Sequence, residues 1–167
     1  MGTVKLPHER YQSPLNYFEL SMQSQITIPC QIDQLGTVPQ YQHPGDSGAD
    51  LCAAIKAPIM LYPGERKIIP TGLRAAIPFG YELQIRGRSS LSLRGIVVAN
   101  APGTIDAGYR AEIGIVLANI GESLFVIEPG IRIAQAVIAP VMRATFVIVD
   151  RLPDSARGDG GFGSTGE

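Results

Sequence analysis

Apolar and polar residues alternate in short runs along this chain, and glycine, proline or polar turns separate one run from the next. In YELQIRG (81–87), for example, Tyr81, Leu83 and Ile85 share one side. Such a period of two is typical of half-buried strands. An apolar helical spacing persists nowhere over more than about two turns, and GRSSLSLRG (87–95) has room for a single helical turn. The pattern predicts an all-β fold, a jelly-roll-like sandwich or barrel of short strands, with at most one short helical turn.

The runs fall within one predicted domain, since 167 residues suffice for one hydrophobic core and no repeat occurs. Residues 1–22 have no clear pattern and are expected to be an N-terminal extension, ordered or disordered. Residues 23–152 are expected to form the β domain, and residues 153–167 a flexible, glycine-rich C-terminal arm. The longest runs are RKIIPTGLRAAI (66–77), YELQIRG (81–87), AEIGIVLANI (111–120), RIAQAVIAPV (132–141) and ATFVIVD (144–150).

The balance of charge narrows the range of partners. The chain has 14 basic and 15 acidic residues and a net charge of −1, which argues against nucleic acid and against a membrane surface, because both bind to basic surfaces. No apolar run reaches the ~18 residues of a spanning helix, and the N-terminus lacks the apolar core of a secretory signal. Two cysteines, Cys30 and Cys52, form neither a disulfide framework nor a metal cluster. These features predict a cytoplasmic protein with reduced thiols.

Two glycine-containing stretches carry polar residues suited to a phosphate. In RGRSSLSLRG (86–95), Arg88 precedes two serines, and a guanidinium, two hydroxyls and turn N–H groups match phosphate oxygens. An equally good interpretation is a serine N-cap beside a surface ion pair. In GDSGADLCAA (45–54), Asp50 enters an apolar strand. Taken alone, Asp50 is best explained as a carboxylate that satisfies turn amides.

A third stretch, NAPGTIDAGYRAE (100–112), places a carboxylate and a phenol ring on one predicted hairpin. Tyr109 follows Asp106 by three residues. The ring can stack on a sugar or base, and the carboxylate can activate water, so the hairpin suits a nucleoside. When this stretch is taken alone, an ordinary turn with a half-buried tyrosine is the favoured interpretation.

The C-terminal stretch RGDGGFGSTGE (157–167) has the composition of a phosphate-binding glycine loop. It contains no Gly-Lys-Ser/Thr and no helix follows it, which excludes a Walker-type P-loop. Its backbone N–H groups, with Arg157, Ser164 and Thr165, suit phosphates, and Phe162 suits a flat ring. A segment of this kind orders when it binds and so acts as a lid. The alternative is a plain flexible terminus.

Five stretches in this order and spacing make a specific resemblance. They resemble the five motifs of the trimeric dUTP pyrophosphatase (dUTPase) family, and the match covers residues 24–166. In order along the chain, the stretches are GADL, GRSSL, NAPGTIDAGYRAE, RIAQAVIAPV and RGDGGFGSTG. The resemblance implies a jelly-roll-like fold and a homotrimer whose active sites are shared between subunits. It also implies that the C-terminal arm of one chain closes over a site made by two others. The implied reaction is Mg²⁺-dependent hydrolysis of dUTP to dUMP and pyrophosphate, which limits uracil in DNA and supplies dUMP for thymidylate synthesis.

The resemblance also implies roles for single residues. Asp106 matches the carboxylate that activates the attacking water. The residues that match those binding uracil and deoxyribose are Asn100, Gly103, Thr104, Tyr109 and Phe162. The residues that match those binding phosphates are Arg88, Ser89, Ser90, Gln135, Arg157, Gly161, Ser164 and Thr165. The metal is expected on the three phosphates, with Asp50 supporting it indirectly through water or supporting the arginines.

Some positions depart from the commonest family pattern. Ser90 stands where many members have glycine, and in DAGYRAE residues Gly108 and Ala111 replace an aspartate and a glycine. None of these is a catalytic position, so the last two affect turn geometry rather than activity.

Two other functions compete with this interpretation. A dCTP deaminase shares the fold and the GRSS motif, but its catalytic glutamate stands three residues before an asparagine, and here Val116 precedes Asn119. Without that carboxylate a deaminase or bifunctional enzyme is disfavoured. A non-catalytic nucleotide-binding jelly roll has no need of Asp106. The two histidines, His8 and His43, precede the predicted core, which argues against a zinc site.

Overall fold

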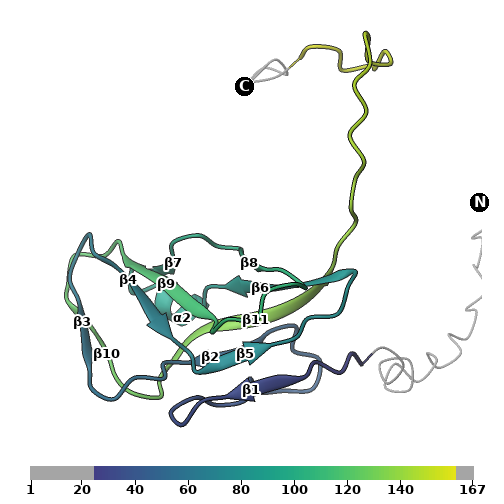
Figure 1. Ribbon diagram of the computed structural model, residues 1–167. Coiled ribbons are helices and arrows are strands. Elements are labelled where there is room, and N and C mark those ends of the chain that lie inside the picture. Colours follow the sequence, from purple (N-terminus) through teal and green to yellow (C-terminus); the bar gives the residue numbers. More distant parts are fainter. Residues whose placement is uncertain (1–24, 161–167) are drawn as a thin grey trace, which may run out of the picture.

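Antiparallel strands make up almost all of the regular structure (Figure 1). The structure is a computed structural model, and it describes residues 25–160. The strands are β1 (Cys30–Ile32), β2 (Ala49–Cys52), β3 (Ile59–Leu61), β4 (Arg66–Pro70), β5 (Leu73–Ala75), β6 (Tyr81–Arg86), β7 (Ile96–Val98), β8 (Gly103–Ile105), β9 (Gly114–Asn119), β10 (Phe125–Ile127) and β11 (Arg132–Pro140). A helical turn, α2 (Ser89–Ser92), lies between β6 and β7. The predicted all-β fold with one short helical turn is confirmed.

The strands pair into two larger sheets and two smaller ones. The larger sheets have the strand orders β2-β11-β6-β8 and β4-β9-β7, while β1 pairs with β5 and β3 pairs with β10. Most neighbours within a sheet are distant along the chain, so the chain crosses repeatedly from one sheet to another. Such crossing between antiparallel sheets is typical of a jelly roll. It brings β2, the start of α2 and β11 together at one end of the first sheet.

Leucine and isoleucine side chains from both larger sheets form the hydrophobic core. Leu83 and Ile85 of β6 are buried together with Ile69 of β4 and with Ile115 and Leu117 of β9. Burying one such side chain stabilises the fold by about 1.5–3 kcal/mol. In β6, and at Ile115 and Leu117 of β9, the buried positions are two residues apart, as the alternation in the sequence predicts. The last two residues of β9, Ala118 and Asn119, are buried as well.

Asn119, at the end of β9, is a buried polar residue with an exposed fraction of 1%. Its Nδ2 donates to the carbonyl oxygens of Leu61 at 2.8 Å and Ser123 at 2.9 Å, and its Oδ1 accepts from the N–H of Gly121 at 2.9 Å. A buried amide with these bonds made holds β3 and the turn before β10 in one geometry. The side chain therefore has a structural role.

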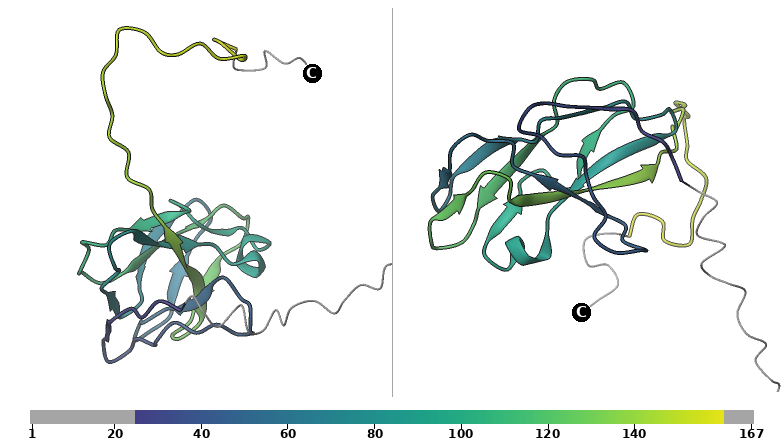
Figure 2. Two further views of the ribbon diagram at one scale, coloured as in Figure 1. Left: turned by 90° about the vertical axis from the view of Figure 1, so that its right-hand side faces the viewer. Right: turned by 90° about the horizontal axis from the view of Figure 1, so that it is seen from below.

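After β11 the chain leaves the body of the molecule, as Figures 1 and 2 show. The N–H of Val141 donates to the carbonyl of Gly80 at 2.8 Å, and beyond it the described backbone–backbone bonds are local to the arm. ATFVIVD (144–150), predicted as a strand, is not one, and Phe146 and Ile148 are 95% and 101% exposed. A strand needs a neighbour for its N–H and C=O groups, and no described segment of this chain pairs with it.

The domain boundaries expected at residues 22 and 152 stay predictions. Residues 1–22 lie outside the part of the chain that the structure describes. Within that part, no helix has both the length and the apolar character needed to cross a membrane.

Candidate active site

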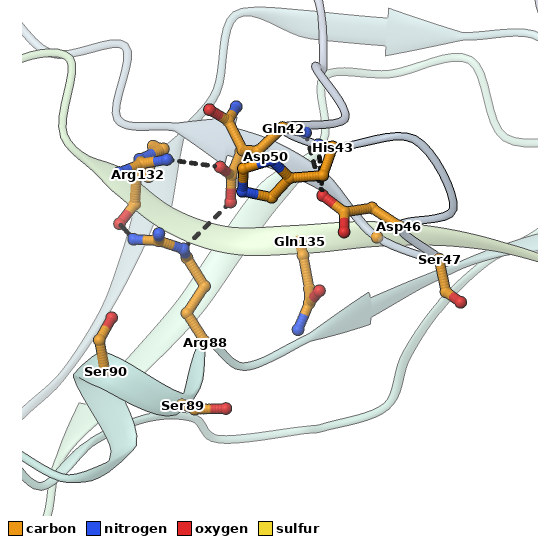
Figure 3. Close-up of a pocket in the computed structure, with 11 residues that line it drawn as sticks. Gln42, His43, Asp46, Ser47, Asp50, Arg88, Ser89, Ser90, Arg132 and Gln135 are labelled. Carbon is orange, nitrogen blue, oxygen red and sulfur yellow. Dashed lines mark hydrogen bonds and ion pairs between the residues drawn. The ribbon is translucent and has the colours of Figure 1, made fainter.

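A polar pocket of about 510 Å³ lies where β2, β11 and the start of α2 meet (Figure 3). We call it the polar pocket. It is lined by Gln42, His43, Asp46, Ser47, Gly48, Asp50, Arg88, Ser89, Ser90, Arg132 and Gln135. Three separate stretches of the sequence, residues 42–50, residues 88–90 and residues 132–135, contribute these side chains.

Asp50 joins two arginines in this pocket. Its Oδ1 lies 3.0 Å from Nε of Arg88, and its Oδ2 lies 3.0 Å from Nη1 of Arg132. Nη1 of Arg88 also donates to the backbone carbonyl of Arg132 at 3.0 Å. The Asp50 side chain is only 12% exposed, and a carboxylate so far from water needs such partners. Both guanidinium groups are thereby held in fixed orientations at the pocket wall.

A bulge in β11 brings Arg132 and Gln135 to the same side. In a regular strand two residues three positions apart point to opposite faces. The pairing register of β11 with β2 shifts between Arg132 and Ala134, where one step along β2 matches two along β11. Beyond the shift Gln135 pairs directly with Asp50. The bulge therefore places a guanidinium and an amide of one strand in one pocket.

Gln135 is held by its contacts with two glycines. Its Nε2 donates to the carbonyl of Gly87 at 2.8 Å. A Cβ atom at Gly48 would lie 2.1 Å from its Oε1, far inside van der Waals contact, so only glycine fits there while Gln135 keeps this position. Gly48 is thus required for close approach rather than for an unusual backbone angle.

The serines of α2 lie at the rim of the pocket. Ser89 and Ser90 are exposed, and Leu91, the next residue, is buried in the core. Arg88 occupies the position before the turn with φ −98° and ψ 131°, and its carbonyl accepts from the N–H of Leu91 at 3.0 Å. The buried leucine anchors the turn, which leaves both hydroxyls at the surface of the pocket.

Residues 100–112 lie elsewhere on the same sheet, and the prediction that they form a hairpin is wrong. Strand β8 pairs with β6, and the next strand, β9, belongs to the other larger sheet, so the stretch is an edge strand followed by a turn. We keep the hairpin only as a name for residues 100–112.

Asp106 directly follows β8, the edge strand, and its carbonyl accepts from the N–H of Tyr109 at 3.0 Å. The Tyr109 hydroxyl donates to the carbonyl of Glu112 at 2.9 Å. Both Asp106 and Tyr109 are exposed, and no residue of this hairpin lines the polar pocket. One turn therefore carries both the carboxylate and the ring, apart from the arginines.

The remaining hairpin residues predicted for a nucleoside lie at the start of this stretch. Gly103 is buried in β8, and Thr104 beside it is exposed. The Asn100 amide packs against Gly103, where a Cβ atom would lie 3.1 Å from Nδ2 of Asn100. Glycine at this position lets the amide approach the backbone of the strand.

The described residues of the arm, 153–160, are not brought to either place in this single chain. Nε of Arg157 donates to the carbonyl of Gly160 at 2.8 Å, and the arm stands away from the body (Figure 2). Gly161, Phe162, Ser164 and Thr165 lie outside the described residues.

A family model for dUTPase matches residues 34–166. The chain belongs to the dUTPase family. It is 55% identical over 143 residues to the deoxyuridine 5'-triphosphate nucleotidohydrolase of Chlamydia pneumoniae, covering 84% of this chain and 99% of that protein. It is 49% identical over 140 residues to the enzyme of that name from Chlamydia trachomatis serovar D, covering 83% and 97%.

Solved dUTPase structures share the fold. The dUTPase of Staphylococcus bacteriophage 80alpha with dUpNHpp has a TM-score of 0.77 and 29% identity, covering 84% of this chain and 99% of that one. The dUTPase of phage phi11 of S. aureus has a TM-score of 0.70 at 24% identity, covering 76% and 98%. The jelly-roll fold and the family expected from the five motifs are therefore both confirmed.

The dUTPase fold unites the first, second and fourth motif stretches in the polar pocket and keeps the third on the hairpin. The sequence pattern did not single out Arg132, which opens the fourth stretch, and it set His43 aside. A period of two places Arg132 and Gln135 on opposite faces of the strand, so only a signal for the bulge could have placed them on the same face. The one available signal is the pair of consecutive apolar residues, Ile133 and Ala134, which are both buried.

Proposed function

We propose that this protein is a dUTP nucleotidohydrolase that converts dUTP and water to dUMP and pyrophosphate. Membership of the dUTPase family and the names of the Chlamydia relatives support this activity. The observation that carries it in this chain is the polar pocket, where Asp50 holds two arginines beside two serine hydroxyls. Guanidinium groups and hydroxyls are the donors that phosphates prefer.

The polar pocket would hold the phosphate chain. Arg88 and Arg132 supply the positive charge, Ser89 and Ser90 supply hydroxyl donors, and the fixed Gln135 supplies an amide. Because these groups are oriented before the nucleotide binds, they stabilise charge on the phosphate oxygens with little reorganisation. Arg157, Gly161, Ser164 and Thr165 of the arm would add donors as it closes over the site.

The hairpin would hold the nucleoside and the attacking water. Asn100, Gly103 and Thr104 would meet the uracil edge, and the exposed ring of Tyr109 would pack on the deoxyribose, with Phe162 of the arm stacking on the base. Asp106 would accept a proton from the attacking water while the oxygen of that water bonds to the α-phosphorus. The bond from the α-phosphorus to the oxygen of the β-phosphate then breaks, so dUMP and pyrophosphate leave and the proton passes to solvent.

The pocket residues are compatible with a metal ion that is bound to the phosphates of the substrate rather than to the protein. Among the described residues, no group of three or more histidine, cysteine, aspartate and glutamate side chains could hold a metal ion. Both oxygens of Asp50 face arginines, so a direct metal bond is disfavoured and an indirect one through water stays a prediction. Mg²⁺ is commonly bound through substrate phosphates, and on the triphosphate of dUTP it would neutralise part of the developing charge.

The separation of pocket and hairpin supports a homotrimer with sites shared between subunits. Neither half is a complete site in one chain. The apolar segment 144–150, with Phe146 and Ile148 exposed, has the alternation of a strand and lacks a strand partner among the described residues. A second copy would supply one, and burial of these side chains would drive association. The enzyme would act in the cytoplasm, where it limits uracil in DNA and supplies dUMP for thymidylate synthesis.

The deaminase alternative gains no support from β9. Val116 occupies the position of the required carboxylate, and the Asn119 amide is engaged in the structural bonds described above. A non-catalytic nucleotide binder differs from the enzyme only in turnover, so an activity measurement separates the two.

The test uses the purified full-length protein with Mg²⁺ and, in separate reactions, dUTP, dCTP, dTTP and UTP. We expect dUMP and pyrophosphate from dUTP alone. Ammonia from dCTP would move the assignment to a deaminase. Binding of dUTP without any product would make the protein a nucleotide-binding jelly roll.

A further inference from the structure

His43 is a polar-pocket residue to which the proposed reaction assigns no role. Figure 3 shows its imidazole in the pocket, on the side where Asp50 and the arginines lie. No metal-ligating group of three or more side chains forms around it among the described residues. The chain has two histidines in total, and the other is His8.

The loop that carries His43 is a hydrogen-bonded turn. Oδ2 of Asp46 accepts from the backbone N–H groups of Gln42 at 3.1 Å and His43 at 2.8 Å, and the N–H of Asp46 donates to the carbonyl of His43 at 3.2 Å. Gly45 within the turn has φ +90°, a left-handed angle that favours glycine. The backbone of His43 is therefore held, and its exposed imidazole lies at the pocket wall.

The charges that face His43 balance. Asp46 on its own turn and Asp50 on β2 are acidic, while Arg88 beside α2 and Arg132 on β11 are basic. Two positive and two negative groups leave the pocket lining without net charge when the imidazole is neutral. A triphosphate brings several negative charges. Mg²⁺ and Arg157 would offset only part of them, and the two pocket arginines are already shared with Asp50, so a further positive group at the pocket wall would be favourable.

We propose that His43 contacts the phosphate chain of the bound nucleotide as an imidazolium, and that nucleotide binding is coupled to proton uptake at this residue. The inference rests on the proposed function of the polar pocket. Histidine changes charge in the neutral pH range, and a nearby anion favours its charged form. When protonated, both ring nitrogens donate, which adds a charge-assisted hydrogen bond to a phosphate oxygen.

The coupling has a defined sign. The bound nucleotide favours the protonated imidazole, so the affinity that His43 contributes is present at low pH and is lost as pH rises through the neutral range. The terminal phosphate of the nucleotide also exchanges protons in this range. That exchange is common to all variants, and the difference between wild type and a His43 variant isolates the imidazole.

The experiment is isothermal titration calorimetry of the full chain with dUpNHpp, in buffers of different ionisation enthalpy. The variants are His43→Gln, His43→Lys and, as the matched control, His8→Gln. For His43→Gln we expect lost proton uptake, an affinity about tenfold weaker at pH 6, and a change of less than about twofold at pH 8.5. His43→Lys, with a permanent charge, keeps tight binding and loses the histidine-dependent part of the pH response. His8→Gln behaves as wild type.

The outcomes separate this proposal from the function on which it rests. Wild-type proton uptake in a folded His43→Gln protein, checked by circular dichroism, would overturn the role of His43 while leaving dUTP hydrolysis in place. A wild-type protein that neither binds dUpNHpp nor hydrolyses dUTP would overturn both. Reduced uptake in His8→Gln, with normal uptake in His43→Gln, would place the proton elsewhere.

Discussion

At the scale of single residues, this chain separates the carboxylate that we propose activates water from the groups that we propose hold phosphate. Asp106 is an exposed carboxylate on a turn, whereas Asp50 is a nearly buried one that contacts two arginines. The same side chain thus has two uses, and the environment decides which. An exposed carboxylate is free to accept a proton, and a carboxylate engaged by two guanidinium groups is a positioning residue.

Replacing Asp106 tests the first use. In Asp106→Asn the shape of the side chain is kept and the proton acceptor is lost, so we expect dUpNHpp affinity to stay near wild type while kcat for dUTP falls about 100-fold or more. Stopped-flow or coupled pyrophosphate assays measure kcat. Glu122→Gln, on the exposed turn after β9, serves as the control with full turnover. Undiminished kcat in Asp106→Asn would remove this residue from the mechanism.

Replacing Asp50 tests the second use. Asp50→Asn removes the negative charge and one of the two oxygen acceptors that the arginines share, so we expect the free energy of unfolding to fall by about 1–3 kcal/mol and kcat/KM to fall at least about tenfold. Denaturant titration and initial rates measure the two effects. Asp154→Asn breaks the Arg151–Asp154 pair, whose side chains are 81% and 88% exposed, and should leave stability unchanged. Wild-type kcat/KM in Asp50→Asn would show that the arginines need no such holder.

At the scale of elements, one irregularity in β11 creates much of the pocket. The bulge after Arg132 turns two residues of the strand to one side, and glycine at position 48 leaves room for the amide of Gln135. Each feature has a cost, since the extra residue of the bulge interrupts the ladder and the glycine before β2 has no side chain to pack. Their place beside Asp50 and Arg88 fits a strand adapted to a ligand.

Gly48→Ala tests this adaptation. The new methyl group would occupy the place of Oε1 of Gln135, so Gln135 must move and its bond to Gly87 is lost. We expect about 1 kcal/mol less stability and weaker dUpNHpp binding, measured by thermal unfolding and calorimetry. Gly108→Ala is the control for stability, because nothing lies within 4 Å of the place its new methyl group would take and its φ is ordinary. Equal stability of the two variants would contradict the tight contact at Gly48.

At the scale of the whole molecule, a single chain holds the parts of a site without assembling it. The polar pocket lies at β2 and β11, and the hairpin lies at β8 on the other edge of the same sheet. The described residues after β11 stand away from the body of the molecule (Figures 1 and 2). The exposed strand-like segment 144–150 gives a reason for the chain to associate. Closed rotational symmetry would then place the pocket of one copy beside the hairpin of another.

Mixed trimers test this arrangement. Subunits carrying Asp106→Asn and subunits carrying Arg88→Ala are each expected to form inactive homotrimers. When the two are co-expressed in equal amounts, about a quarter of the sites would combine an intact hairpin with an intact pocket from different subunits. We expect dUTPase activity to return in that proportion, measured on the purified mixture of all trimers. In trimers selected to contain both kinds of subunit the proportion would be about one third. If the mixture stays as inactive as either parent, each site belongs to one subunit.

The sequence by itself determined the local conformation and the chemical repertoire. The period of two and the turn residues determine that the chain forms short strands, and the motif order identifies residues such as Arg88 and Asp106, because both signals are read from neighbours along the chain. The tertiary structure alone decided which distant residues meet. The Arg132–Asp50 contact joins residues 82 positions apart, and the bulge that turns Arg132 into the pocket appears only when β2 and β11 pair. Likewise, residues 144–150 have the pattern of a strand. Whether they form a strand depends on pairing with a neighbouring strand, which a local pattern cannot supply.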